Sequence, residues 1–205
     1  MILKKAVSLS NINLVNIPIF KNSFTYGLGD LIQKSILFFL IPIYSSYIST
    51  DEYGVLGILL VANLFTQPLL GLGLTNGVAR FFFTKDKKNK NNKNNVVWSP
   101  FIFSISWSSI LLVFLINFSD QLSVFLFDQI NFTTHIKITF FTAFFLNITS
   151  FNKTILTFEE KPWLFNAVNI SNVLILTLSA IILIIYMELS LLGLLYSYLI
   201  ASIFT

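Results

Sequence analysis

The sequence contains no cysteine and a single histidine. The absence of cysteine from all 205 positions excludes disulfides, thiolate metal sites and thiol nucleophiles. The lone His135 and the scattered acids cannot assemble a metal cluster, so we expect neither a metal nor another cofactor. Walker loops, dinucleotide fingerprints and nucleophile elbows are also missing. We therefore expect that the protein is not an enzyme.

Charge is scarce as well. Charged residues make up 11% of the chain, whereas a soluble domain carries about 25%. Hydrophobic residues make up 55%, and phenylalanine alone occurs 23 times, so the chain cannot cover itself with a polar surface. The apolar runs are continuous rather than alternating, which excludes a transmembrane barrel. The composition predicts an all-α fold, a polytopic transmembrane helical bundle.

Six long apolar segments define the predicted spans. The first five are near or above the roughly 20 residues that a helix needs to cross a hydrocarbon core, and the sixth is slightly shorter. The segments cover about 24–48, 55–80, 96–118, 132–158, 163–186 and 189–205. We interpret 1–20 as a cytoplasmic lead-in and 21–205 as one transmembrane lobe.

The basic residues lie in alternate connections. Lysines precede the first span, follow the second in the run 85–93, and lie between the fourth and fifth at Lys161. The other turns, 49–54, 119–131 and 187–190, contain acids but no lysine or arginine. The positive-inside rule then places the N-terminus in the cytoplasm. The formal charge of +4 sits beside membrane spans, so we expect membrane lipids rather than nucleic acid as partners.

The first span contains an acid and a base four residues apart. Asp30 and Lys34 share a helix face with Gly27. Each charge costs roughly 2.5 to 3.5 kcal/mol at bilayer depth. Their attraction at an effective dielectric of 20 returns only about 4 kcal/mol for the pair. Neighbouring groups or cavity water must supply the rest, so the pair either neutralises itself while packing helices or lines a wet cavity.

Two further features point to the inner half of the bundle. Three basic residues are placed to line it: Lys34, Arg80 and Lys153. Such a cluster suits an anion, and phosphate is the obvious candidate. For Arg80 and Lys153 the alternative is that the side chain snorkels to the membrane interface.

Pro68 lies within a stripe of polar and small residues on the second span. It removes a backbone hydrogen bond, so we expect a kink or hinge there.

A specific resemblance rests on motifs in and between the spans. The chain resembles the polysaccharide biosynthesis, or oligosaccharide (O-antigen) flippase, proteins of the multidrug/oligosaccharidyl-lipid/polysaccharide exporter superfamily. The motifs are Tyr26-Gly27-x-Gly29, Pro42-x-Tyr44, Asp51-Glu52-Tyr53-Gly54, Leu70-Gly71-Leu72-Gly73, Ala79-Arg80-Phe81-Phe82, Glu159-Glu160-Lys161-Pro162 and Leu191-Leu192-Gly193.

The resemblance implies one lobe of a MATE-like, two-lobe transporter in a bacterial or archaeal cell membrane. Its relatives move lipid-linked oligosaccharide to the outer leaflet by alternating access, for surface polysaccharide biosynthesis. This chain corresponds to the N-terminal lobe, apparently truncated before a second one, so we expect transport by the chain alone to be incomplete. The implied partners are a polyprenyl-diphosphate-linked oligosaccharide and either a second six-helix lobe or polysaccharide assembly proteins.

The resemblance also implies roles for individual side chains. Lys34, Arg80 and Lys153 are expected to contact the diphosphate, with Asp30 tuning Lys34. Sugar hydrogen bonds are expected from four polar residues that have helix pairing as their alternative; these are Tyr26, Asn63, Gln67 and Asn147. Three other functions stay open: a cation-coupled multidrug exporter, a membrane glycan polymerase, and a non-transporting remnant or assembly partner.

Overall fold

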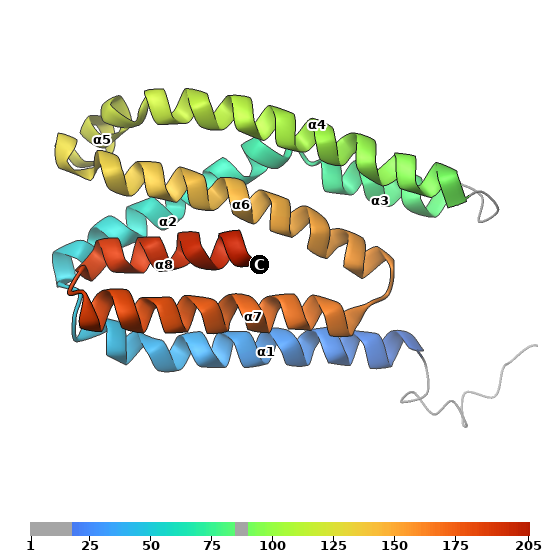
Figure 1. Cartoon of the computed structure of the whole chain (residues 1–205), viewed down its shortest axis with the longest axis horizontal. Helices are drawn as coiled ribbons and strands as arrows, with labels where there is room; N and C mark the ends of the chain where they lie inside the picture. Colours follow the sequence, from blue (N-terminus) through green and yellow to red (C-terminus); the bar gives the residue numbers. More distant parts are fainter. Residues whose placement is uncertain (1–17, 85–89) are drawn as a thin grey trace, which may run out of the picture.

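The computed structural model describes residues 18–84 and 90–205, which form helices and no strand (Figure 1). The long helices are α1 (Pro18–Ser45), α2 (Thr50–Gly71), α4 (Lys90–Asn117), α6 (Thr133–Phe158) and α7 (Pro162–Ala180). The shorter ones are α3 (Leu74–Thr84), α5 (Ser119–Phe127), α8 (Ser190–Phe204), the 3-10 turn Ile130–Phe132 and the π-helix Ile181–Tyr186. The predicted all-α fold is confirmed; of the predicted lead-in 1–20, residues 1–17 lie outside the described residues and 18–20 belong to α1.

The predicted second span is two helices rather than one. We expected a kink at Pro68, but α2 continues past it to Gly71, and the chain breaks at Leu72 and Gly73. Both residues adopt the left-handed conformation, with φ of 47° and 63°. The Leu72 N–H closes α2 by donating to the Pro68 carbonyl at 2.9 Å. The chain therefore breaks at the left-handed pair four residues after Pro68, and the hinge at Pro68 itself stays a prediction.

The break leaves carbonyls at the end of α2 without partners from their own helix. Helix α4 supplies donors to them. The Trp107 indole N–H donates to the Leu69 carbonyl at 3.0 Å, and the Ser108 hydroxyl lies 3.3 Å from the Leu70 carbonyl. Side chains of a neighbouring helix thus satisfy backbone groups that lipid could not.

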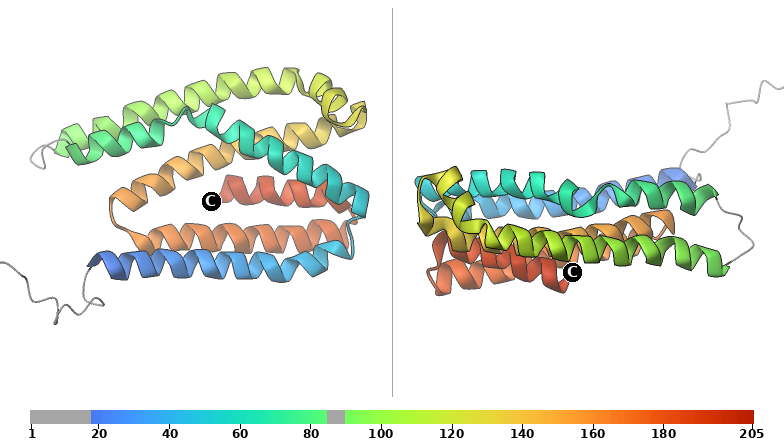
Figure 2. Two further views of the ribbon diagram at one scale, coloured as in Figure 1. Left: turned by 180° about the vertical axis from the view of Figure 1, so that it is seen from behind. Right: turned by 90° about the horizontal axis from the view of Figure 1, so that it is seen from above.

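Helix α6 occupies the centre of the bundle. It packs against α2, α4 and α8, while α1 packs against α7 and α7 against α8. Seen from above, α1, α2 and α3 lie over a layer formed by α4, α6, α7 and α8 (Figure 2). Because other helices surround α6, it tolerates buried polar residues that a lipid-facing helix could not carry; they include Thr139, Thr142 and Asn147.

The apolar core lies toward one end of the bundle. Its residues include Leu40, Ile48, Leu56, Ile136 and Leu191, which gather where the α1–α2 turn meets the start of α8. From that end α1 and the α2–α3 pair diverge toward the opposite end (Figures 1 and 2). The lobe is thus tightly packed at one end and splayed at the other.

Glu52 links the elements at the packed end. Its carboxylate accepts the Ser49 N–H at 2.9 Å and completes a capping box at the start of α2. The same carboxylate accepts the Ser190 hydroxyl at 2.6 Å. The Asp-Glu-Tyr-Gly motif therefore ties the first turn of α2 to the first turn of α8.

Within the described part of the chain, four helical stretches are long and apolar enough to cross a membrane: Ser23–Pro42, Thr50–Gly71, Val97–Asn117 and Pro162–Tyr186. Exposed aromatic residues with polar edges lie at both ends of these stretches, where membrane proteins concentrate them. Trp98 and Trp163 lie at the splayed end, and Tyr47 and Tyr186 at the packed end. These features indicate a membrane protein.

We predict that the two ends of the bundle face opposite sides of the membrane. The helix order places the end of α3, the start of α4 and the 158–162 connection at the splayed end, and the acidic connections at the packed end (Figure 1). Topology reporters fused near Asn91 and Lys161 should give a cytoplasmic signal, and those near Glu52 and Asp128 an external one. An external signal at Asn91 would overturn this orientation.

Candidate functional site

Helix α1 presents one face that no other described helix covers. A concave surface of about 800 Å³ runs along it, lined by Gly27, Asp30, Leu31, Lys34, Ser35, Phe38 and Phe39. We call these seven residues the open face of α1. The predicted acid–base spacing is confirmed in so far as Asp30 and Lys34 share this face.

Asp30 and Lys34 do not form an ion pair with each other. Among the described residues, the ion pair within 4 Å joins Lys161 to Glu159. The Asp30 carboxylate instead accepts the Asn169 amide of α7 at 3.5 Å. It also lies close enough to Lys153 of α6 for the two charges to attract each other. Asp30 thus has an amide partner on α7 and a nearby opposite charge on α6, while the tuning of Lys34 by Asp30 stays a prediction.

Lys153 lies beside an aromatic pair. Its ammonium is 5.2 Å from the centroid of the Phe165 ring, a cation–π distance. That ring packs edge-on against Tyr26 with centroids 5.0 Å apart. The Tyr26 hydroxyl is buried near Thr157, without the geometry of a hydrogen bond. Lys153 and Tyr26, both predicted site residues, therefore meet where α1, α6 and α7 converge.

A close approach of α1 and α7 fixes this arrangement. The Asn166 amide of α7 donates to the Thr25 carbonyl of α1 at 2.7 Å. Gly29 faces the same side chain so closely that an added Cβ would lie 2.1 Å from the Asn166 Oδ1. The glycine at position 29 of the Tyr-Gly-x-Gly motif therefore leaves the space that the Asn166 side chain occupies. Gly27, in contrast, has nothing within 4 Å of a Cβ position.

The third predicted basic residue lies elsewhere. Arg80 is exposed on α3, which lies across the bundle from α1 in both orientations (Figures 1 and 2). The structure thus brings Lys153 toward Asp30 but leaves Arg80 on the opposite side of the splay. A ligand that contacts Arg80 and Lys34 together would have to span the space between α1 and α3.

The remaining predicted polar residues bond between or within helices. The Gln67 amide donates to the Ala143 carbonyl of α6 at 3.2 Å and to the Asn63 side chain at 3.5 Å. The Asn147 amide donates to the hydroxyls of Ser104 and Ser108 on α4 at 3.3 and 3.0 Å. Gln67 and Asn147 therefore pair helices, the alternative that their spacing left open, while Asn63 also lines a groove.

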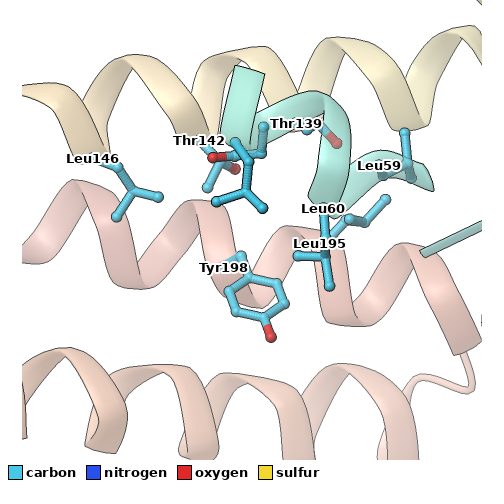
Figure 3. Close-up of a pocket in the computed structure, with 9 residues that line it drawn as sticks. Leu59, Leu60, Thr139, Thr142, Leu146, Leu195 and Tyr198 are labelled. Atoms are coloured by element: carbon cyan, nitrogen blue, oxygen red, sulfur yellow. The ribbon is translucent and has the colours of Figure 1, made fainter. Parts of the chain in front are cut away.

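That groove, about 330 Å³ in volume, lies between α2, α6 and α8. Figure 3 shows Leu59, Leu146 and Leu195 pointing into it, with Tyr198 at one side. The Thr139 and Thr142 hydroxyls of its wall donate to carbonyls of their own helix at 2.8 Å. The groove surface is therefore nearly all apolar, unlike the open face of α1.

Sequence reasoning missed the asparagines of α7. Asn166 and Asn169 hold α1, and Asn172 donates to the Ala201 carbonyl of α8 at 3.3 Å. Their spacing of three residues on an otherwise apolar helix is a signal that could have found them. The link between Glu52 and Ser190 had no comparable signal, because the two residues lie 138 positions apart.

Comparison of the chain with models of known families, with characterised proteins and with solved structures finds no match.

We predict that Gly29→Ala destabilises the protein whereas Gly27→Ala does not. The new methyl group at position 29 must displace Asn166, and overpacking of this kind costs about 1–3 kcal/mol. At position 27 the methyl group enters open space, and alanine favours a helix over glycine by about 1 kcal/mol. Thermal denaturation of the detergent-purified variants measures both effects. Equal melting temperatures for the two variants would contradict the close approach.

We also predict that Asp30 is coupled more strongly to Lys153 than to Lys34. In a double-mutant cycle, Asp30→Asn with Lys153→Met should show an interaction energy of about 1 kcal/mol. The matched cycle with Lys34→Met should show a smaller one, because Lys34 is exposed on the open face of α1 whereas Lys153 is partly buried, and burial strengthens the attraction between charges. Unfolding free energies of the purified variants provide the measurement. The reverse result would restore the pair within α1.

Proposed function

We propose that this chain forms one six-span lobe of a transporter that moves a lipid-linked oligosaccharide with an anionic headgroup across the bacterial or archaeal cell membrane. The observation that carries the proposal is the gathering of charged and amide groups at the junction of α1, α6 and α7. Asp30 and Lys153 lie on apolar helices there, and Lys34 lies one turn from Asp30 on the open face of α1, where an isolated charge is costly. Membrane proteins place such groups along pathways for polar cargo more often than in scaffolds.

The balance of charge at this junction favours an anion. Lys153 contributes one positive charge and Lys34 another, whereas Asp30 contributes the one carboxylate among the residues lining the open face of α1. Asn169 donates its amide to that carboxylate, and the two positive charges exceed the one negative charge, which favours phosphate oxygens as ligands. The splay places this junction toward the basic end of the bundle, from which a cytoplasmic headgroup would enter.

The apolar surfaces suit the rest of such a cargo. The groove between α2, α6 and α8 and the lipid-facing helices are apolar, so a polyprenyl chain can remain in a hydrocarbon environment while the headgroup occupies the polar junction. Arg80 on α3 would contact a headgroup that reaches across the splay. Tyr26 and Asn63 are the candidate sugar contacts.

A cation-coupled exporter is the second candidate, because Asp30 is an intramembrane acid beside an amide. Lys153 weakens this alternative, since it already supplies a positive charge to Asp30. Asp30→Asn distinguishes the two functions. It should abolish transport in a cation-coupled exporter but leave diphosphate binding nearly unchanged in a flippase.

We predict that the purified chain binds polyprenyl diphosphate more tightly than polyprenol. Lys34→Ala, Arg80→Ala and Lys153→Ala should each weaken that binding about tenfold or more, because a charge-assisted contact contributes about 1.5–3 kcal/mol. Arg80→Lys should recover part of the loss, since it keeps the charge but not the bidentate geometry. Native mass spectrometry or lipid-quenching titration measures the affinities.

Lys137→Ala is the matched control, because Lys137 lies near the start of α6, at the packed end and away from the junction.

In a flippase-deficient host that also expresses the reading frames adjoining the gene, the same three alanine variants should lose surface glycan at normal protein levels. Full glycan display and unchanged diphosphate affinity in all three variants would refute the cationic site.

A further inference from the structure

The open face of α1 carries two charges within a stretch that crosses the membrane. Asp30 and Lys34 are both exposed and lie within the span Ser23–Pro42, whose residues are mostly unburied by the rest of the chain. Their neighbours Leu31 and Phe38 are 62% and 68% exposed. Lipid would leave the Lys34 charge unsolvated at a cost of roughly 2.5–3.5 kcal/mol, and Asp30 would have only Asn169 and Lys153 to compensate its charge. A cover that carries charges of its own would stabilise both groups.

The charge pattern of the face is complementary to itself. Asp30 and Lys34 are one turn apart, a rise of about 6 Å along the helix, and are not paired with each other. A two-fold axis along the membrane normal would bring α1 of two copies together in parallel. Lys34 of each copy would then lie one turn from Asp30 of the partner subunit, a distance that the lysine side chain spans. The symmetry makes two equal ion pairs from one surface.

We propose that the open face of α1 is the contact between two copies of this chain in the membrane. The shape of the face agrees with this occupant. Gly27 is exposed, with open space where a Cβ would lie, and Ser35 is the other small residue of the face. Small residues allow membrane helices to approach closely, while Leu31 and Phe38 provide apolar contact area.

This inference goes beyond the proposed function, because it holds for any cargo. It also supplies what the junction of α1, α6 and α7 lacks. That junction has walls from a single copy, and a second copy would provide the facing wall and a second set of basic residues. A diphosphate entering between the copies would compete with Asp30 of the partner subunit for Lys34.

Cysteine crosslinking tests the contact without an activity assay, since the sequence has no cysteine of its own. In native membranes, Leu31→Cys should form a disulfide-linked dimer on mild oxidation. The adjacent Ile32→Cys is the matched control, because it is also exposed and at similar depth but points about 100° away around the helix. We expect several-fold more dimer from Leu31→Cys. Equal crosslinking at both positions, or none at either, would overturn the proposal.

Charge reversal tests which partner covers the face. Added to Leu31→Cys, either Asp30→Lys or Lys34→Asp should abolish crosslinking between identical chains, because like charges then face each other. Co-expression of the two reversed chains, each with its own tag, should restore a mixed dimer. Failure of the mixed pair, or crosslinking to a different protein, would show that the occupant is not a second copy.

The variant Gly27→Leu separates loss of the dimer contact from loss of folding. Its side chain enters open space in the single chain, so melting temperature and membrane level should stay near those of the parent. The same side chain blocks close approach of two α1 helices, so dimer formation by Leu31→Cys should fall several-fold. Undiminished crosslinking in this variant would contradict the contact.

Discussion

Every backbone polar group at bilayer depth needs a partner within the protein, and the whole arrangement depends on this constraint. It explains why the apolar segments are helices, and it explains where they are interrupted. The break between α2 and α3 is tolerated because Trp107 and Ser108 of α4 reach the Leu69 and Leu70 carbonyls. Helix α4 is thereby held against the end of α2, and Asn147 of α6 joins the same group through the Ser104 and Ser108 hydroxyls.

The constraint extends to side chains and separates two regions of the bundle. Near the break between α2 and α3, the polar side chains hydrogen-bond to one another or to backbone carbonyls, so few hydrogen-bonding groups remain for a ligand. At the junction of α1, α6 and α7, the Tyr26 hydroxyl is buried without a hydrogen bond, and Lys34 faces outward one turn from Asp30. Buried hydroxyls without a hydrogen bond also occur at Tyr44 and Tyr53, so the charges, rather than the unsatisfied groups, distinguish the proposed site.

The sequence allowed the helices to be predicted more completely than the site. All six apolar segments contain a helix, since continuous apolar runs of this length permit little else. The break at Leu72 and Gly73 was not predicted, because a left-handed conformation at a leucine has no signal in the sequence. Helical spacing placed Asp30 and Lys34 on one face, but it could not give the partners of Asp30, which belong to α6 and α7.

The pairing of α1 with α7 bears on how the chain enters the membrane. The hydrogen bonds from Asn166 and Asn169 join residues 141 and 139 positions apart. During synthesis, α1 is made long before α7, so these hydrogen bonds can form only after most of the chain has been synthesised. Until then, the compensation within reach of Asp30 is Lys34, one turn away on the same helix. The acid–base spacing therefore helps α1 to insert early, before the finished lobe gives Asp30 its other neighbours.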